Sequence, residues 1–348
     1  MSATTQLVRT AHATSIAAVG RELAAVHRDM LRAGGDDAAV RLSVLNLVIA
    51  CAAESDTDDA TAVIERIAAR HPARVIMLVA DPDAPAAIEA DISLQCSAVG
   101  GREQVCAEVV RLRVGGESAL HLVSVVTPLL LADVPVDLWL AGAARLDQAL
   151  GDEALAACER LIVDTGAYSD PRSAIGMLAR ATAHPNRRLD VADIAWTRTA
   201  LWRQLVAQAF DAAAVRPFVA GVERAVIATA GASGAEALLL GAWLRSRLDR
   251  PGCRIPEVEL HGRNGGGEER GSLLAVRLQC RRDGAAATIE VTRASGAMSV
   301  LTTLDGGPST ANTVPAPTPS LAELVGALLA DPGADLIYLA AVQRAAQE

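Results

Sequence analysis

The residues most suited to recognising another molecule lie close together in the segment 196–203, which contains Trp196, Arg198, Trp202 and Arg203. Residues 190–210 have the apolar spacing of a helix, and Arg198 falls in the middle of the apolar stripe. A guanidinium there needs a carboxylate, a group of carbonyl oxygens or an external ligand, because an unpaired buried charge is costly. The sequence therefore predicts either an internal ion pair of Arg198 that ties the two halves of the chain together or a contact with a partner protein or an anion.

Tryptophan and arginine are also residue types that are enriched at the most important positions of protein interfaces. The helical projection places Trp196 and Arg203 towards the edge of the stripe and Trp202 deeper within it. We therefore expect Trp196 and Arg203, rather than Trp202, to make the main contact with a partner. Asp190 or Asp193 is expected to cap the start of this helix.

Two further segments could bind an anion, and each has a simpler interpretation. Arg74 follows Pro72 where a helix ends and a strand is expected to begin, so it could bind an anion, contact a partner or only fill the junction. The turn 231–234 precedes a helix and could bind phosphate through free N–H groups. A capping box formed by Ser233 and Glu236 explains the same residues without a ligand.

Catalytic chemistry finds little support in the sequence. Glu117 and His121 are spaced as neighbours on a helix, but no nucleophile accompanies them, so packing or a local hydrogen bond explains them. The chain contains no lysine, which excludes a Schiff-base lysine and a P-loop. No C-x-x-C pair indicates a zinc ribbon or a thioredoxin motif. We therefore expect no enzyme activity, no cofactor and no metal.

Cys96 and Cys106 could form a redox-sensitive pair. They lie in two β-rich segments separated by Gly100 and Gly101, which read as a hairpin. If the turn centres on Gly101, the two cysteines face each other, where cross-strand Cβ atoms approach to about 4.5–5.5 Å. A disulfide there would be regulatory rather than structural in the cytosol, and a shift of one residue in the register would abolish it.

The composition bounds the class of protein. A chain of 348 residues, half of them hydrophobic, is long enough for two domains with separate cores. The net charge of −9, without a basic block, disfavours nucleic acid or an anionic membrane as partner. We also find no secretory signal and no apolar run long enough to span a membrane, so we expect a cytoplasmic protein.

The pattern of elements predicts two domains, 1–168 and 169–348. In the first, buried strands at 41–51 and 75–79 flank a capped helix at 55–70, which is a βαβ unit and favours a mainly parallel α/β sheet. Its other expected elements are helices at 15–31, 117–131 and 146–158, strands at 134–140 and 161–164, and the hairpin of 90–96 with 105–114.

The second domain is expected to be α+β with antiparallel strands. A strand at 222–229 and a helix at 233–248 follow the helix 190–210. Four more segments rich in β-formers, separated by glycine-rich turns, are expected to pair antiparallel, and the proline-containing segment 306–320 is expected to be a mobile loop. The four strands are 257–261, 272–281, 286–293 and 298–303, and two short helices end the chain.

Several segments, taken together and in order, carry a family resemblance. They are HPARVIMLVADP at 71–82, CAEVVRLRV at 106–114, HLVSVVTPLLLADVPVDLWLAG at 121–142, DIAWTRTALWRQLVAQAFD at 193–211, GAEALLLGAWLRSRL at 234–248 and LAELVGALLADPGADLIYLAAV at 321–342. In this order they resemble the glucose-6-phosphate dehydrogenase assembly protein family, OpcA. The family often has paired tryptophans where this chain has Trp139-Leu140.

The resemblance implies a non-enzymatic effector. Such a protein would bind glucose-6-phosphate dehydrogenase, favour its active oligomer and raise its apparent affinity for sugar phosphate. It would do so through a higher affinity for the active state of the enzyme. One alternative is an enzyme or sensor that binds a sugar phosphate or nucleotide at the carboxyl edge of the sheet, using Arg74 and the turn 231–234. Another is a structural scaffold with no effect on kinetics.

Overall fold

The computed structural model describes residues 6–33, 43–99, 103–144, 146–149, 157–183, 189–253, 255–264, 267 and 269–347. The chain forms two compact units. Unit 1 comprises 1–164, 187–192 and 320–333, and unit 2 comprises 165–186, 193–319 and 334–348. The first crossing lies close to the boundary expected after residue 168, but the chain then returns to unit 1 twice.

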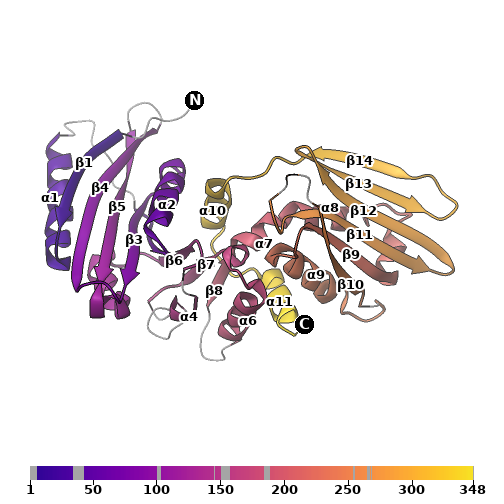
Figure 1. The fold of residues 1–348 in the computed structure, drawn as a ribbon. Coiled ribbons are helices and arrows are strands. Elements are labelled where there is room, and N and C mark those ends of the chain that lie inside the picture. The colour runs from indigo at the N-terminus through magenta and orange to yellow at the C-terminus, as the bar shows by residue number, and fades with distance from the viewer. Residues whose placement is uncertain are drawn as a thin grey trace. The chain divides into compact units, whose positions relative to one another are not determined.

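Unit 1 contains an eight-stranded sheet in the order β1-β4-β5-β3-β2-β6-β7-β8 (Figure 1). The neighbours from β5 through β3, β2 and β6 to β7 pair in parallel, which confirms the mainly parallel sheet. The hairpin of β4 and β5 is confirmed, and β1 adds antiparallel to β4. The bounds are β1 Gln6–Ala13, β2 Leu45–Cys51, β3 Ala73–Asp81, β4 Ala87–Val99, β5 Glu103–Gly115, β6 Val136–Ala141, β7 Arg160–Val163 and β8 Asp190–Asp193.

The alternation of side chains along β5 separates the two faces of this sheet. Val110 and Leu112 belong to the apolar core that helix α1 (Ile16–Ala33) helps to complete. Arg111 and Arg113, between and beyond them, instead bind side chains of helix α2 (Glu54–Ile67). Helix α2 therefore covers the opposite face, against which it buries the apolar side chains of Ala60, Val63, Ile64 and Ile67. Helix α10 (Leu321–Ala330) packs in turn against α2.

The single buried helix expected at 117–131 is wrong. The structure has the 3-10 helix η1 (Gly116–Leu120), α3 (Leu122–Val126) and a second 3-10 helix, η2 (Thr127–Leu129). His121 leaves the helical conformation, with φ −123° and ψ 47°, and Pro128 lacks the N–H that a continuous helix would use. The expected helix at 146–158 is described only as α4 (Leu146–Ala149), because residues 150–156 lie outside the described part of the chain.

Unit 2 contains a six-stranded sheet in the order β10-β9-β11-β12-β13-β14. Helices α8 (Ala200–Gln208) and α9 (Ala235–Leu248) cover one face of it, where their apolar side chains join the inward residues of β9, β11 and β12 (Figure 1). The strand bounds are β9 Val222–Ala230, β10 Glu257–Arg263, β11 Leu273–Arg282, β12 Ala285–Ala294, β13 Ala297–Leu304 and β14 Thr310–Pro315. Helix α6 (Pro171–Thr182), α7 (Ile194–Arg198), η4 (Arg216–Gly221) and α11 (Leu336–Ala345) complete the unit with η3 (Thr165–Ala167).

Two expectations for this sheet are wrong. The segment 257–261 was expected to be antiparallel, but β10 pairs in parallel with β9, because α9 carries the chain from one strand to the other as a crossover. The segment 306–320 was expected to be a loop, but β14 pairs antiparallel with β13. Its residues are mostly exposed, so they lack the apolar alternation that marks a half-buried strand.

The expected helix 190–210 is divided into three elements. Residues Asp190–Asp193 form β8, α7 follows immediately, and Thr199 separates α7 from α8. The Thr199 hydroxyl donates to the Trp196 carbonyl oxygen at 2.7 Å and accepts a hydrogen bond from Arg203 Nε at 3.0 Å. Asp193 does cap the first helix, since its carboxylate accepts from Ala195 N at 2.9 Å.

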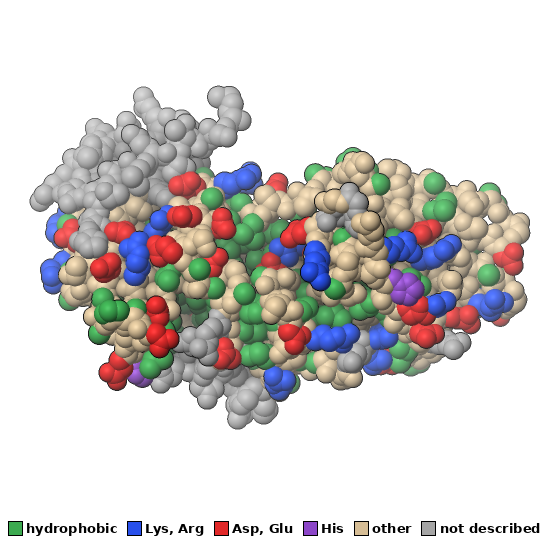
Figure 2. Space-filling model, viewed as in Figure 1, with side chains coloured by type: hydrophobic (Ala, Val, Ile, Leu, Met, Phe, Trp, Pro, Cys, Tyr) green, Lys and Arg blue, Asp and Glu red, His purple; other side chains and the backbone are tan. Residues whose placement is uncertain are grey.

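Acidic and basic side chains are interspersed on the face of each unit that Figure 2 shows. No extended group of basic side chains appears among the described residues in that view. No helix in the described part of the chain combines the length and the apolarity that crossing a bilayer requires.

Candidate partner-binding site

Five residues from two segments of unit 2 that are far apart in the sequence form a connected group that we call the Trp196 cluster: Asp193, Trp196, Arg203, Asp335 and Tyr338. Asp193 is 1% exposed, and its carboxylate accepts hydrogen bonds from neighbouring backbone and hydroxyl groups, including the Tyr338 hydroxyl at 3.2 Å. Burial, together with the negative charge of Asp193, raises the pKa of Tyr338 well above its usual value. Tyr338 therefore remains a neutral hydrogen-bond donor to that carboxylate.

Asp335 connects α7 to α11 through its two carboxylate oxygens. Oδ2 accepts from Trp196 Nε1 at 2.7 Å, and Oδ1 accepts from the backbone N–H groups of Ile337 and Tyr338 at 2.8 and 2.9 Å. The residue is thus the N-cap of α11 and the partner of the indole at the same time. The Trp196 ring also lies 5.7 Å from the Tyr338 ring, at an interplanar angle of 50°.

Arg203 lies over the outer side of this group. Its Cζ atom is 3.5 Å from the centre of the Trp196 ring, which is the geometry of a cation–π contact. Burial lowers the pKa of Arg203 to about 10, an effect that the Asp335 carboxylate partly offsets. Nε donates to Thr199 Oγ1, whereas the described residues provide no hydrogen-bond acceptor for the two terminal nitrogen atoms. The guanidinium is thus partly desolvated, and its terminal N–H groups remain available to donate hydrogen bonds to a partner.

The other two expected residues of this segment lie deeper in unit 2. Arg198 is paired with Glu236 of α9, with 4.0 Å between Nε and Oε1, so an internal ion pair is present, but both residues of this pair belong to unit 2. Trp202 is 2% exposed and belongs to the core under the sheet. Trp196, which we expected at the edge of the stripe, is nearly as buried, at 4%. A partner would therefore meet Arg203 before either tryptophan.

Arg74 belongs to the interior of unit 1. Its Nε donates to Glu108 Oε2 at 2.6 Å, and Nη1 donates to the carbonyl oxygen of Leu129 at 2.8 Å. Both charged groups are buried, so each charge requires the other as its ion-pair partner. Arg74 is the second residue of β3 and hence lies at the amino edge of the parallel sheet, not at the carboxyl edge where the small-ligand alternative required it.

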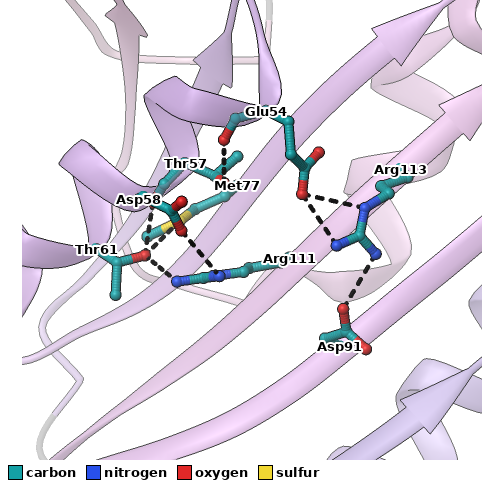
Figure 3. A network of polar contacts seen from close by, with 8 residues as sticks. All are labelled: Glu54, Thr57, Asp58, Thr61, Met77, Asp91, Arg111 and Arg113. Carbon is teal, nitrogen blue, oxygen red and sulfur yellow. Dashed lines mark hydrogen bonds and ion pairs between the residues drawn. The ribbon is translucent and has the colours of Figure 1, made fainter.

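The carboxyl edge carries a network of acidic and arginine side chains that the sequence did not reveal (Figure 3). Arg113 of β5 donates to Glu54 of α2 at 2.9 and 3.1 Å and to Asp91 of β4 at 3.1 Å. Arg111 lies 3.6 Å from Asp58 and donates to the Thr61 hydroxyl at 2.5 Å. The alternation of Arg111 and Arg113 with apolar residues was the available signal, but only the sheet order places them beside α2.

The same edge disfavours a phosphate group. The parallel sheet reverses its strand order between β2 and β6, where such folds usually bind nucleotides. However, Glu54 and Asp56 occupy the first turn of α2, and Asp56 Oδ2 already accepts from Ala53 N at 2.9 Å. Burial, with Asp56 and Glu54 adding to the effect, raises the pKa of Cys51 to about 12, so this thiol stays protonated. Negative charge at this helix start would repel a phosphate.

The turn 231–234 has a packing explanation. Gly231 has φ +72°, and its N–H donates to the carbonyl oxygen of Arg263 at 2.8 Å. A Cβ atom at Gly262 would lie 2.3 Å from the carbonyl oxygen of Gly231, so the turn and β10 approach too closely for a side chain. The expected capping box is wrong, because Gly234 is the N-cap of α9 and no side chain caps it.

Glu117 and His121 lie at the surface, not on one helix as expected. They line a cavity of about 400 Å³ with five other residues, namely Ile16, Ser118, Ser124, Val125 and Pro128. Among the residues that the structure describes, no group of histidine, cysteine and acidic side chains could hold a metal ion.

The hairpin register places Cys96 directly opposite Cys106, as the sequence analysis expected. Their side chains lie outside the described part of the structure, so the redox pair stays a prediction. Among the described cysteines, Cys51, Cys253 and Cys280 are free thiols.

Comparison with known protein families decides what kind of chain this is. Residues 64–180 match the glucose-6-phosphate dehydrogenase subunit N-terminal domain of OpcA, and residues 189–342 match the corresponding C-terminal domain. The chain belongs to the OpcA family. The Trp196 cluster lies wholly within the C-terminal OpcA domain, as do the exposed first residues of α11.

Curated OpcA relatives agree with this assignment. The chain is 26% identical over 192 residues to the putative OxPP cycle protein OpcA of Synechocystis sp., and 28% identical over 185 residues to that of Synechococcus elongatus. It is 28% identical over 190 residues to the protein of the same name from Nostoc punctiforme. The matches cover 52–55% of this chain but only 40–41% of each OpcA relative.

Proposed function

We propose that this chain binds glucose-6-phosphate dehydrogenase, favours its active oligomer and raises its apparent affinity for sugar phosphate, without catalysing a reaction itself. The observation that carries the proposal is the match of two consecutive domains described as parts of a glucose-6-phosphate dehydrogenase subunit. The names of the relatives, which refer to the OxPP cycle, agree with it. The proposal places the chain in the cytoplasm with the enzyme and gives it no nucleic-acid or membrane partner.

Activation of this kind is a shift of populations. A binding protein can favour the active oligomer only by as much as its affinity for that oligomer exceeds its affinity for the inactive form. An affinity ratio of about 100 contributes about 2.7 kcal/mol and could raise a mainly inactive population to a mainly active one. No catalytic residue is needed for this effect, since all of the work is done by differential binding.

Within this proposal, the expected site residues have different tasks. Arg203 contacts the partner, and the Trp196 ring holds the Arg203 guanidinium in place through the cation–π contact. Arg198, Trp202 and Arg74 act by holding their own units together, because each is paired or buried there. Cys96 and Cys106 would make the activity respond to oxidants if they form a disulfide.

The alternative function, a small-ligand enzyme or sensor, is less well supported. The acidic first turn of α2 and the position of Arg74 argue against a phosphate at the carboxyl edge of sheet β1–β8. At the turn 231–234, the following helix α9 carries the carboxylate of Glu236 in its first turn, which also disfavours a phosphate there. Tight binding of glucose-6-phosphate or a nucleotide by the isolated chain, measured by calorimetry, would favour this alternative.

The decisive experiment measures dehydrogenase activity against glucose-6-phosphate concentration, using the enzyme of the same organism with and without this chain. We expect the saturation curve to move to lower substrate concentration, with an effect that saturates at a fixed molar ratio. Sizing chromatography of the mixture should show a complex and a larger fraction of the active oligomer. An unchanged curve together with separate elution would contradict the proposal.

A further inference from the structure

An exposed apolar pair begins helix α11. Leu336 is 75% exposed and Ile337 is 40% exposed. The other large hydrophobic side chains with comparable exposure among the described residues are isolated in the sequence, namely Val44, Leu120, Ile255 and Leu301. Single exposed apolar residues are ordinary, but an adjacent pair at one helix end is a candidate for burial against another protein.

The backbone that carries this pair is held in place on several sides. Asp335 caps the first turn and binds the Trp196 indole, as described above. Tyr338, the next residue along the helix, is 1% exposed and donates to buried Asp193. Further along α11, Gln343 Nε2 donates to the carbonyl oxygen of Ala179 in α6 at 2.7 Å. A partner that binds here has little conformational entropy to remove, which favours affinity.

Arg203 adds a charged donor to this apolar surface. The guanidinium lies on Trp196, and Trp196 is bonded to the residue that precedes Leu336. Its terminal nitrogen atoms have no acceptor among the described residues, although the group is partly withdrawn from water. A planar guanidinium fixed on an aromatic ring is suited to a bidentate contact with a carboxylate.

We propose that Leu336, Ile337 and Arg203 form one docking surface, and that the docked segment of the partner carries a carboxylate beside an apolar side chain. The inference rests on the proposed function, since the partner it assigns is the dehydrogenase. The carboxylate completes the hydrogen bonding of Arg203, and the apolar side chain covers Leu336 and Ile337. A free phosphate fits less well, because it would satisfy Arg203 but leave the two aliphatic side chains of this surface exposed to water.

The test uses the chain of residues 1–348 and three substitutions, with binding to the dehydrogenase measured by calorimetry. Leu336→Asp removes the apolar contact, and an acidic residue suits the first turn of a helix, so α11 should persist. Arg203→Gln removes the positive charge. Arg203→Glu introduces a negative charge on a side chain of nearly the same size as glutamine. The matched controls are Leu301→Asp on β13 and Arg277→Gln on β11, both at exposed positions.

We expect Leu336→Asp to weaken binding about tenfold or more, as for a residue central to an interface. Arg203→Gln should weaken it by a similar factor, and Arg203→Glu should weaken it further, because two carboxylates would then face each other. Both controls should bind like the wild type. Unchanged near-ultraviolet circular dichroism would show that each variant keeps its fold.

Several results would overturn the inference while leaving the proposed function intact. If the wild type binds and Leu336→Asp binds equally well, the docking surface lies elsewhere. If Arg203→Glu binds as well as Arg203→Gln, the partner presents no carboxylate, and if it binds more tightly, the partner presents a basic group. Self-association of the wild type that Leu336→Asp abolishes would assign the surface to a second copy. Absence of binding by the wild type would instead contradict the proposed function itself.

Discussion

At the scale of single residues, two carboxylates organise the Trp196 cluster. Asp193 ends a strand, caps a helix and accepts from Tyr338, while Asp335 caps a second helix and accepts from Trp196. Both therefore combine a local task with a contact that spans more than 130 residues of sequence. A carboxylate can do this because its two oxygen atoms accept hydrogen bonds from different directions.

Replacing Asp335 by alanine should destabilise unit 2. The loss of the helix cap costs about 1 kcal/mol, and the loss of the indole acceptor costs about another 1 kcal/mol. Urea unfolding should therefore show a free energy of unfolding lower by about 2 kcal/mol. Asp335→Ser is the matched control, since serine also caps helices, and it should restore about half of the loss. Equal stability of all three proteins would contradict this account of Asp335.

The cysteine pair of the hairpin makes a separate prediction. Under a mild oxidant, the count of free thiols should fall by two, and Cys96→Ser or Cys106→Ser alone should prevent the change. Cys51 and Cys280 should not contribute, because burial raises the pKa of each thiol to about 12 and little reactive thiolate forms. Cys253→Ser serves as the control. An unchanged thiol count in the wild type would end the redox hypothesis.

At the scale of elements, Asn46 shows how one side chain places a strand. It is fully buried in β2, where Nδ2 donates to the carbonyl oxygens of Leu131 and Val134 at 3.0 and 3.3 Å. Its Oδ1 accepts from Leu131 N at 2.8 Å. These bonds fix the segment that leads into β6, and β6 pairs with β2 itself.

Asn46→Ala should therefore lower the free energy of unfolding by about 3 kcal/mol, because it leaves buried backbone groups without partners. Thermal or urea unfolding of the purified chain would measure the change. Asn312→Ala on the exposed strand β14 is the control and should have an effect below about 0.5 kcal/mol. A small effect at Asn46 would mean that water replaces its hydrogen bonds.

The elements that could be predicted from the sequence are those with a strong local signal. The buried strands β2 and β3 follow from their continuous apolar runs, and the two closing helices follow from the local sequence pattern. The register that places Cys96 opposite Cys106 follows from the position of the glycine turn between them. The division of 190–210 could not be predicted from the apolar spacing. Asp193 accepts a hydrogen bond from Thr165, which is distant in the sequence, and Thr199 separates α7 from α8 through local hydrogen bonds that the apolar spacing does not report. The strand β14 was missed because its residues are exposed.

The candidate site was predictable only in part, for a related reason. The spacing of Trp196 and Arg203 pointed to an unusual helix, and the structure brings the two side chains together. Their connection to Asp335, and with it the exposed Leu336, depends on a segment more than 130 residues away. Sequence periodicity describes one helix face at a time and cannot predict a contact between two segments that are distant in the sequence.

At the scale of the whole molecule, unit 1 is completed by a late segment of the chain. Helix α10 packs against α2, and Gly326 lies beside Ile67, whose Cγ2 would be in ordinary van der Waals contact, at 3.5 Å, with a Cβ atom at that position. Arg160, which forms a buried ion pair with Asp137, also donates to the carbonyl oxygen of Leu328 at 2.8 Å. The first 164 residues alone therefore lack part of their own core.

A chain ending at Pro319 should be much less stable than the full chain. It exposes the part of α2 that α10 covers, around Ile67, and leaves Arg160 without one of its acceptors, so unit 1 should bind the dye ANS and unfold at lower urea concentration. A second truncation ending after Gly333 keeps α10 and is the control for unit 1. If the chain ending at Pro319 has the unit 1 stability of this control, then α10 contributes nothing to the core of unit 1.

The late position of α10 also has a consequence for biosynthesis. Domains of many proteins fold in order as they leave the ribosome, with the N-terminal one first. Here unit 1 includes residues 320–333, so nearly all of unit 2 has been translated before the core of unit 1 can be completed. During that interval the uncovered side of α2 is open to other nascent chains and to chaperones, and translation of residues 320–333 becomes the step that protects it.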